Sequence, residues 1–451
     1  MQVKARGAQI PIKVVASSTR RRHTQIRSWL AALAAAVLLT TLATTTATAT
    51  AAPAGAAGDP TVISDWNALA VTTLLGDTTK PGPETILYMG FVQAAVYDAV
   101  VGVEGRYEPY RFHAHAPRGT SAQAAAVAAA HQVLVTYSPY AQTTLDAAYA
   151  ASLARLPDGT AKTRGIAFGT RAANHLIARR TNDGRNAPVL FTQPPAPGVW
   201  RPTPPAFAPM VSPWMAFVTP LLVHSPTQFA PPPPPKLTSA RYTRDFNEVK
   251  AFGSATSTVR TAAQTDTARF FSGNPLIMFN AALRDQVTVR DLDLVDAARM
   301  FAAVDMSIAD AIISVWHAKY TDGTWRPITA ITLADTDNNP ATDPDPSWMP
   351  LFPTPAYPEY PSGYNGFVAA ASRGLEDALH TRHLQLTLTS TAAPNLPRQY
   401  DSGSVLRQDV VDARMWLGIH FRFGDTAARD MGVRLADWTL DHYFQPVQEE
   451  R

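Results

Sequence analysis

The sequence has no cysteine, so no disulfide bond can stabilise the protein. Burial of apolar side chains must supply the stability instead. A chain of roughly 400 residues beyond an N-terminal leader is long enough for this, as one large domain or as two. Alternating apolar and polar runs are scarce, and no Gly-rich nucleotide-binding loop is present. These absences argue against a protein built mainly of β-sheet and against one that binds nucleotides through such a loop.

Acidic residues are absent from residues 1–51, which carry seven Lys and Arg residues. An apolar run from Leu30 to Leu42 follows the basic start, and small residues of the A-x-A type occupy positions 47–51. This order is typical of a signal peptide that is cleaved during export. The apolar run is too short to span a bilayer comfortably. We therefore expect a secreted or cell-envelope protein with no stable membrane association.

Removal of this leader changes the charge balance of the chain. The 39 Lys and Arg residues fall to 32, whereas all 36 Asp and Glu residues remain. The remaining protein is mildly acidic, and no basic stripe is left that would bind nucleic acid.

Helical patterns dominate the rest of the sequence. The apolar spacing and the breakers predict helices over 121–137, 144–156, 161–180, 295–320, 363–380 and 408–419. Ser121 is the expected N-cap of the first, and Pro139 ends it. The predicted fold class is an all-α helical bundle.

Proline is concentrated in residues 193–236, which cannot be helical. This segment separates an N-terminal helical half, residues 52–192, from a C-terminal helical half, residues 237–451. It could be a flexible linker. However, its aromatic residues favour a packed crossover that wraps the bundle; they are Trp200, Phe207, Trp214, Phe217 and Phe229.

Three segments of the C-terminal half carry groups that suit a tetrahedral oxyanion. They are Lys319 with Arg326-Pro327, Pro361-Ser362-Gly363, and Arg414 with His420. A helix beginning after Ser362 would offer free N–H groups to the anion, and the glycine would let the anion approach the backbone. Arg favours planar recognition of oxyanions, and an imidazole can bond to the central atom.

Each of these segments also has an ordinary explanation. Lys319 could neutralise the end of its own helix, Ser362 could be a simple N-cap, and His420 could satisfy a helix end. Three cations that face one another inside a bundle would repel strongly without an anion between them. The side chains therefore either point outward or surround an anion.

The spacing of Arg414 and His420 adds a geometric condition. Six positions on a continuous helix place two side chains about 120° apart. They can converge if the helix ends near Gly418, with His420 on its final turn and Gly424 just beyond the end.

The order K-x6-R-P, P-S-G and R-x5-H resembles that of the vanadium-dependent haloperoxidase and type-2 phosphatidic acid phosphatase-like superfamily. Further segments resemble its secreted bacterial haloperoxidase-like branch, namely residues 89–100, 198–202, 236–250 and 326–340. The resemblance covers nearly the whole chain beyond the leader. It implies an α-helical fold built around two four-helix bundles, with the anion at the end of one.

The resemblance also implies roles for individual residues. His420 would be the apical ligand to vanadium, and phosphate could occupy the same site as vanadate. The vanadate oxygens would be held by Lys319, Arg326, Ser362, Gly363 and Arg414. The implied reactants are hydrogen peroxide, a halide and a small organic acceptor.

Two positions depart from the superfamily pattern. Tyr364 stands where the superfamily has the His that acts as acid and base, and Ala413 replaces a Ser. A Tyr with a pKa near 10 donates a hydrogen bond at neutral pH but shuttles protons poorly. Two alternatives to haloperoxidase activity therefore remain. One is a phosphomonoesterase that forms a phosphohistidine at His420; the other is a degenerate oxyanion-binding or isomerase-type homologue.

Overall fold

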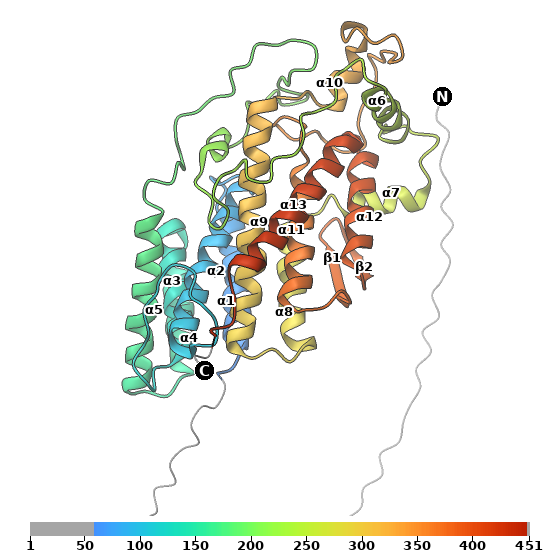
Figure 1. Cartoon of the computed structure of the whole chain (residues 1–451). Helices are drawn as coiled ribbons and strands as arrows, with labels where there is room; N and C mark the ends of the chain where they lie inside the picture. Colours follow the sequence, from blue (N-terminus) through green and yellow to red (C-terminus); the bar gives the residue numbers. More distant parts are fainter. Residues whose placement is uncertain (1–57, 449–451) are drawn as a thin grey trace, which may run out of the picture. The chain divides into compact units, whose positions relative to one another are not determined.

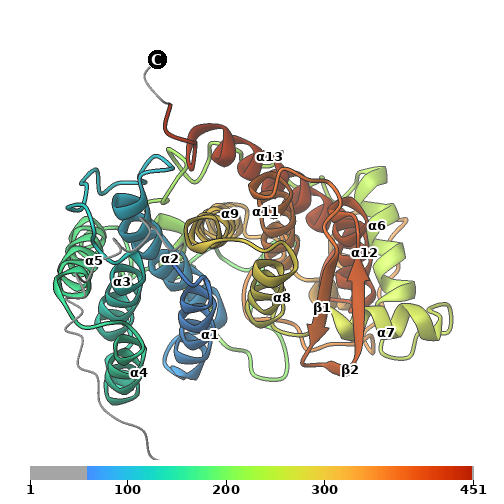
Figure 2. The same cartoon turned by 90° about the horizontal axis from the view of Figure 1, so that it is seen from below.

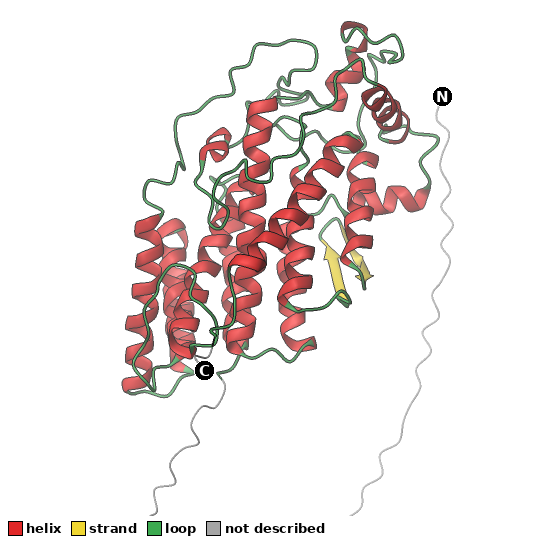
Figure 3. Cartoon of the chain, viewed as in Figure 1, coloured by secondary structure: helices red, strands yellow, loops and turns green. Residues whose placement is uncertain are grey.

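The computed structural model of the protein describes residues 58–448. The expected signal peptide, residues 1–51, lies outside the described residues. The described residues form one compact unit. Helices and long loops make up nearly all of the described chain (Figure 3).

The α-helices occupy the following ranges: α1 (Thr61–Gly76), α2 (Gly82–Glu104), α3 (Ala122–Tyr137), α4 (Gln142–Ala154), α5 (Thr160–Arg179), α6 (Ala240–Phe252), α7 (Ala262–Phe270), α8 (Pro275–Val289), α9 (Leu294–Asp322), α10 (Pro327–Thr332), α11 (Gly363–Ala378), α12 (Gly403–Trp416) and α13 (Arg422–His442). Three short 3-10 turns, η1 (Pro139–Ala141), η2 (Pro213–Phe217) and η3 (Ala334–Thr336), lie between them. The fold is all-α, as the sequence predicts.

The long helix α9 joins two groups of helices. It packs against α2 on one side and against α11 and α13 on the other. In Figure 2 it lies between the group α1–α5 and the group α8, α11, α12 and α13. Asp293 caps its start by accepting from the N–H groups of Val295 (3.1 Å) and Asp296 (3.0 Å), and Gly323 ends it in the left-handed conformation.

Several local predictions are confirmed. Ser121 caps α3, its hydroxyl accepting from the Ala124 N–H at 3.1 Å, and Pro139 follows the end of the helix. The ends of α4, α5, α9 and α11 lie within a few residues of the predicted ones. The start of α12 was predicted five residues too late, since its first two residues, Gly403 and Ser404, are poor helix formers.

A two-stranded antiparallel hairpin was not anticipated. Strands β1 (Leu386–Ser390) and β2 (Ala393–Tyr400) pair beside α12, and the labelled arrows mark them in Figure 1. Only β1 alternates regularly between buried and less buried residues, and β2 is mostly exposed and contains proline. The pattern in the sequence was therefore too weak to predict the pair.

Helix α2 is long and apolar enough to cross a membrane, but 94% of its most apolar window is buried inside the protein. It packs against α9 and α3, so it serves as a core helix.

The Pro-rich crossover, residues 193–236, packs on the bundle, as its aromatic residues suggested. Trp200 and Trp214 are buried. The expectation was wrong for two of the aromatic residues, since Phe207 and Phe217 are largely exposed. Phe207 follows a turn and has a left-handed backbone (φ 48°), and Phe217 is the last residue of the 3-10 turn η2.

One buried carboxylate of α9 fixes the end of this crossover. Asp310 accepts hydrogen bonds from the backbone N–H groups of Leu221 (2.6 Å), Leu222 (2.7 Å) and Val223 (2.9 Å). Burial raises the pKa of Asp310 to about 6, against the opposing effect of the three N–H donors. The carboxylate is therefore ionised at pH 8, where it satisfies donors that would otherwise be buried without a partner.

We expect Asp310→Asn to destabilise the protein by about 2 kcal/mol or more, because the new amide N–H₂ would face backbone donors. Thermal unfolding at pH 8 measures the change. The matched control is Asp285→Asn on the exposed side of α8, which should leave the unfolding midpoint unchanged. Equal midpoints for the two variants would contradict the role given to Asp310.

Candidate oxyanion site

Lys319 lies in the last turn of α9, and its side chain is completely buried. Its Nζ donates to the carbonyl oxygens of Pro358 (2.6 Å) and Glu359 (2.8 Å). Burial lowers the pKa of Lys319 well below its usual value, and the charge of Arg326 lowers it further. The ammonium group therefore points into the bundle instead of neutralising an exposed helix end.

Arg326 stands at the N-cap position of α10, with the extended backbone expected before Pro327. Its Nε donates to the Tyr357 carbonyl (2.8 Å) and its Nη1 to the Ile419 carbonyl (2.7 Å). Burial lowers the pKa of Arg326. Its Nη2 is buried and has no acceptor in the part of the chain that the structure describes. This N–H₂ group is a donor available to a ligand.

Arg414 lies in the last turn of α12 and is also buried. Its Nη1 donates to the Phe271 carbonyl at 2.9 Å, and burial lowers the pKa of its guanidinium. Its Nε has no acceptor among residues 58–448. Arg414 thus offers a second buried donor to a ligand.

Tyr364 lies beneath this arginine. The guanidinium carbon of Arg414 is 4.6 Å from the centre of the Tyr364 ring, within the range of a cation–π contact. The Tyr364 hydroxyl donates to the Gly273 carbonyl at 3.2 Å and lies 3.5 Å from the Met278 Sδ. Burial raises the pKa of this hydroxyl above its usual value. The hydroxyl proton is therefore directed at a backbone carbonyl.

His420 lies in the short segment between α12 and α13, which corrects the sequence prediction in two respects. Helix α12 ends at Trp416, so His420 is not on its final turn. Gly424 lies inside α13 and does not mark a helix end. The prediction that the helix ends near Gly418 is correct. Gly418 takes the left-handed conformation (φ 77°), and the chain reverses there.

The imidazole of His420 is buried and has two polar neighbours. Its Nδ1 lies 2.8 Å from Oε1 of Glu359, and its Nε2 lies 3.3 Å from Nη1 of Arg326. Burial, together with the charges of Arg326 and Lys319, lowers the pKa of His420 well below its usual value. The ring is therefore neutral at neutral pH, as a metal ligand or a nucleophile requires.

Ser362 occupies the N-cap position of α11, but its hydroxyl does not cap the backbone of the helix. The hydroxyl oxygen lies 3.3 Å from Nδ2 of Asn365, which donates to Oδ1 of Asp425 at 2.8 Å. Burial raises the pKa of Asp425 well above its usual value, and the nearby Glu359 raises it further. In the described residues the N–H of Gly363, first in α11, has no backbone acceptor.

The structure brings the predicted cations and the histidine together. Arg326 contacts His420 directly. The Lys319 ammonium is 5.0 Å and the Arg326 guanidinium 4.8 Å from the centre of the Tyr357 ring. Tyr357 and Arg414 line one cavity. The alternative, in which the side chains point outward and are unrelated, is excluded by their burial.

A cavity of about 150 Å³ leads to this cluster. Its polar lining includes Gly363 and Arg414, and most of the remaining wall is apolar, formed by residues such as Ile86, Trp316 and Phe367. The cavity therefore leads to Arg414 and Gly363 between mostly apolar walls.

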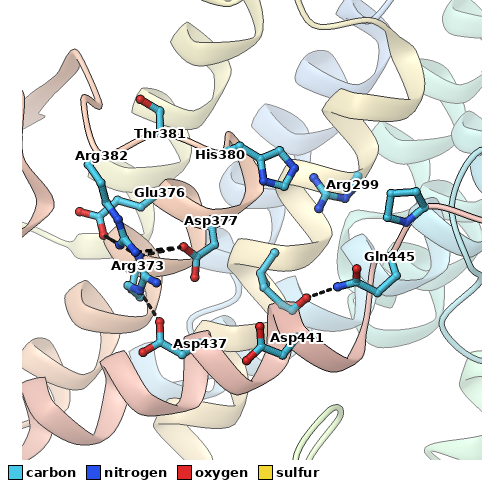
Figure 4. A pocket seen from close by; sticks show the side chains of 12 residues that line it. Arg299, Arg373, Glu376, Asp377, His380, Thr381, Arg382, Asp437, Asp441 and Gln445 are labelled. Carbon is cyan, nitrogen blue, oxygen red and sulfur yellow. Dashed lines mark hydrogen bonds and ion pairs between the residues drawn. The ribbon is translucent and has the colours of Figure 1, made fainter.

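A wider cavity of about 710 Å³ lies elsewhere, between the ends of α11 and α13 (Figure 4). Its charged residues pair with one another: Arg373 bonds to Asp377 and Asp437, and Arg382 bonds to Glu376. With three Arg and four acidic residues in its lining, this cavity offers no excess of positive charge to an anion. The smaller cavity is the better candidate site.

Two residues of the site escaped the sequence analysis, namely Glu359 and Asp425. Both are buried carboxyl groups next to the cations. Burial raises the pKa of Glu359 to about 7, although Lys319 and Arg326 oppose the shift. An acidic residue among the prolines and aromatics just before Pro361 was the available signal.

Comparisons with known proteins find similarity in sequence and in fold. Residues 299–449 match the family of the VCPO second helical-bundle domain. Vanadium chloroperoxidase of Curvularia inaequalis is 27% identical over 211 residues, which are 35% of this chain and 34% of that protein. The match thus spans about a third of that relative's length.

Solved structures share the fold over most of the chain. A bacterial vanadium-dependent iodoperoxidase superposes with a TM-score of 0.72 at 22% identity, covering 87% of this chain and 98% of that one. A bacterial vanadium-dependent chloroperoxidase superposes with a TM-score of 0.65 at 18% identity, covering 80% and 91%. The chain therefore shares the helical fold of these vanadium-dependent haloperoxidases.

An oxyanion should stabilise the folded protein, because it fills a cluster of buried donors. Orthovanadate or phosphate at 100 times its dissociation constant would add about 2.7 kcal/mol. Thermal unfolding with and without each anion measures this gain. We expect Arg414→Gln to lose most of it and Arg118→Gln, on an exposed loop, to keep it. Equal gains in both variants would place the anion elsewhere.

Proposed function

We propose that the protein is an exported vanadate-dependent haloperoxidase that uses hydrogen peroxide to oxidise a halide. The observation that carries the proposal is the pair of buried guanidinium donors of Arg326 and Arg414, which have no acceptor among residues 58–448 and lie close to the imidazole of His420. Export rests on the leader-like composition of residues 1–51. The iodoperoxidase and chloroperoxidase with the same fold support the choice of chemistry.

The donor set fits vanadate. Arg326 Nη2, Arg414 Nε and the Gly363 N–H would bind its oxygens, together with Lys319 and the Ser362 hydroxyl, and His420 Nε2 would be the ligand to vanadium. When bound, vanadate supplies a Lewis-acidic centre that activates hydrogen peroxide without changing its own oxidation state. Phosphate has the same shape and could occupy the same donors.

The residues of the chain contribute charge, orientation and exclusion of water. Lys319, Arg326 and Arg414 withdraw negative charge from the bound oxyanion, and burial strengthens this effect because the local dielectric constant is low. His420 stays neutral, so its Nε2 lone pair is available. The apolar cavity beside Tyr364 gives a small organic acceptor a place close to the site.

Tyr364 separates haloperoxidase from phosphatase chemistry. A phosphomonoesterase needs a proton for the departing alkoxide, and the group at this position would be the natural donor. The Tyr364 hydroxyl is directed at the Gly273 carbonyl, and burial raises its pKa. The anion cluster itself suits phosphate, so a phosphatase using His420 as nucleophile is the second candidate.

Halogenation of a phenolic dye with vanadate, peroxide and bromide or iodide tests the proposal. We expect turnover well above that of protein-free vanadate, and its loss in His420→Ala. The control Arg118→Gln should keep wild-type turnover. A rate equal to that of free vanadate would reject the haloperoxidase proposal and favour the degenerate oxyanion-binding or isomerase-type homologue.

The variant Tyr364→His restores an acid and base at the mouth of the site. We expect turnover of p-nitrophenyl phosphate to rise about tenfold or more, because positioned proton transfer is worth 10²–10⁴ in rate. The gain should vanish in the double variant with His420→Ala. High phosphatase activity in the wild type, abolished by His420→Ala, would instead establish the second candidate.

A further inference from the structure

Glu359 is completely buried, and its carboxyl group forms a hydrogen bond with the Nδ1 side of the His420 ring, opposite the Nε2 that faces Arg326. Its Oε1 lies 2.8 Å from His420 Nδ1 and accepts from the Phe421 backbone N–H at 3.2 Å. Its backbone carbonyl accepts from Lys319 at 2.8 Å. The residue thus contacts both the imidazole and one of the cations of the cluster.

The contacts on the two sides of the ring favour one tautomer. The Arg326 guanidinium can only donate, but its Nη1 lies 3.3 Å from Nε2 and already donates to the Ile419 carbonyl at 2.7 Å, so this contact suits an accepting Nε2 without enforcing it. Oε1 of Glu359 is the closer partner, at 2.8 Å, and as an acceptor it favours the ring proton on Nδ1. A neutral imidazole held in this state presents the bare Nε2 lone pair to the anion cluster.

Gly424 provides the space that the carboxyl group of Glu359 needs. A Cβ at residue 424 would lie 2.3 Å from Oε1 and 2.8 Å from Oε2 of Glu359. Gly424 has no unusual backbone angle, and it lies in the first turn of α13. A side chain there would therefore point directly at the carboxyl group of Glu359. The glycine therefore leaves this volume to the carboxyl group of Glu359.

We infer that Glu359 is a positioning residue, which with Gly424 holds the His420 ring so that Nε2 is unprotonated and faces the oxyanion. The inference rests on the proposed function, because it deals with the same site. It assigns Glu359 no contact with the oxyanion. Partners of this kind orient metal-binding histidines, and their loss weakens metal affinity by 10–100-fold.

Three variants test the role of Glu359. Glu359→Ala removes the acceptor, and Glu359→Gln keeps an acceptor of the same size without the charge. The double variant Glu359→Ala with Gly424→Asp relocates the carboxylate, since the new side chain starts at the point where Glu359 now ends. An Asp in the first turn of α13 also suits the helix N-terminus.

The first readout is the protonation of the His420 ring, which needs no vanadate. In protein labelled with ¹⁵N-histidine, the ring signals that His420→Gln removes are those of His420. We expect a protonated Nδ1 and a bare Nε2 in the wild type and in the relocated variant, and a mixture of tautomers in Glu359→Ala. Unchanged ring signals in Glu359→Ala would overturn the inference.

The second readout is the affinity for orthovanadate, measured by titration calorimetry with phosphate as the comparison anion. We expect a 10–100-fold loss for Glu359→Ala, a smaller loss for Glu359→Gln and recovery to within several-fold in the relocated variant. Wild-type affinity in Glu359→Ala would overturn the inference. Failure of the relocated variant to recover, although folded with the wild-type melting midpoint, would also overturn it.

The two readouts separate the inference from the proposed function. A wild type that binds no vanadate rejects the proposed cofactor, whereas the ring signals still decide whether Glu359 sets the tautomer. If Glu359→Ala does not fold, Glu359→Gln and the relocated variant carry the same comparison.

Discussion

The site depends on the burial of three cationic side chains around one irregular segment of backbone. The carbonyls of residues 357–359 accept from Lys319 and Arg326, because this segment belongs to no helix and its acceptors are free. Arg414 finds one more carbonyl, that of Phe271. These neutral acceptors satisfy only part of the donors, so the remaining positive charge calls for an anion.

The burial of these three cations also explains why carboxyl groups are buried around the cluster. Glu359 and Asp425 are buried carboxyl groups near the cations, and burial raises the pKa of each. Neither pairs with a cation through its side chain; Glu359 bonds to His420, and Asp425 bonds to Asn365. The acids thus orient the neighbours of the site and leave the guanidinium groups free for a ligand.

The burial of the cations also gives a role to Tyr364, which stands where the superfamily pattern has a His. The Tyr364 ring packs against the Arg414 guanidinium and helps to shield this cation from water, and the Tyr364 hydroxyl donates to the Gly273 carbonyl. Tyr364 thus supports the Arg414 cation and does not shuttle a proton. Activation of peroxide depends on the positive field, whereas hydrolysis of a phosphate ester also depends on a proton donor.

The sequence by itself determined the helices with strong caps and periodicity, such as α3 and α9, and the three segments that carry the cations. Local signals suffice there because helix formation and capping involve residues only a few positions apart. The tertiary structure alone decided that Glu359 meets His420, 61 positions away, that the chain reverses at Gly418, and where the Tyr364 hydroxyl points. These features depend on packing between distant segments, which no local pattern encodes.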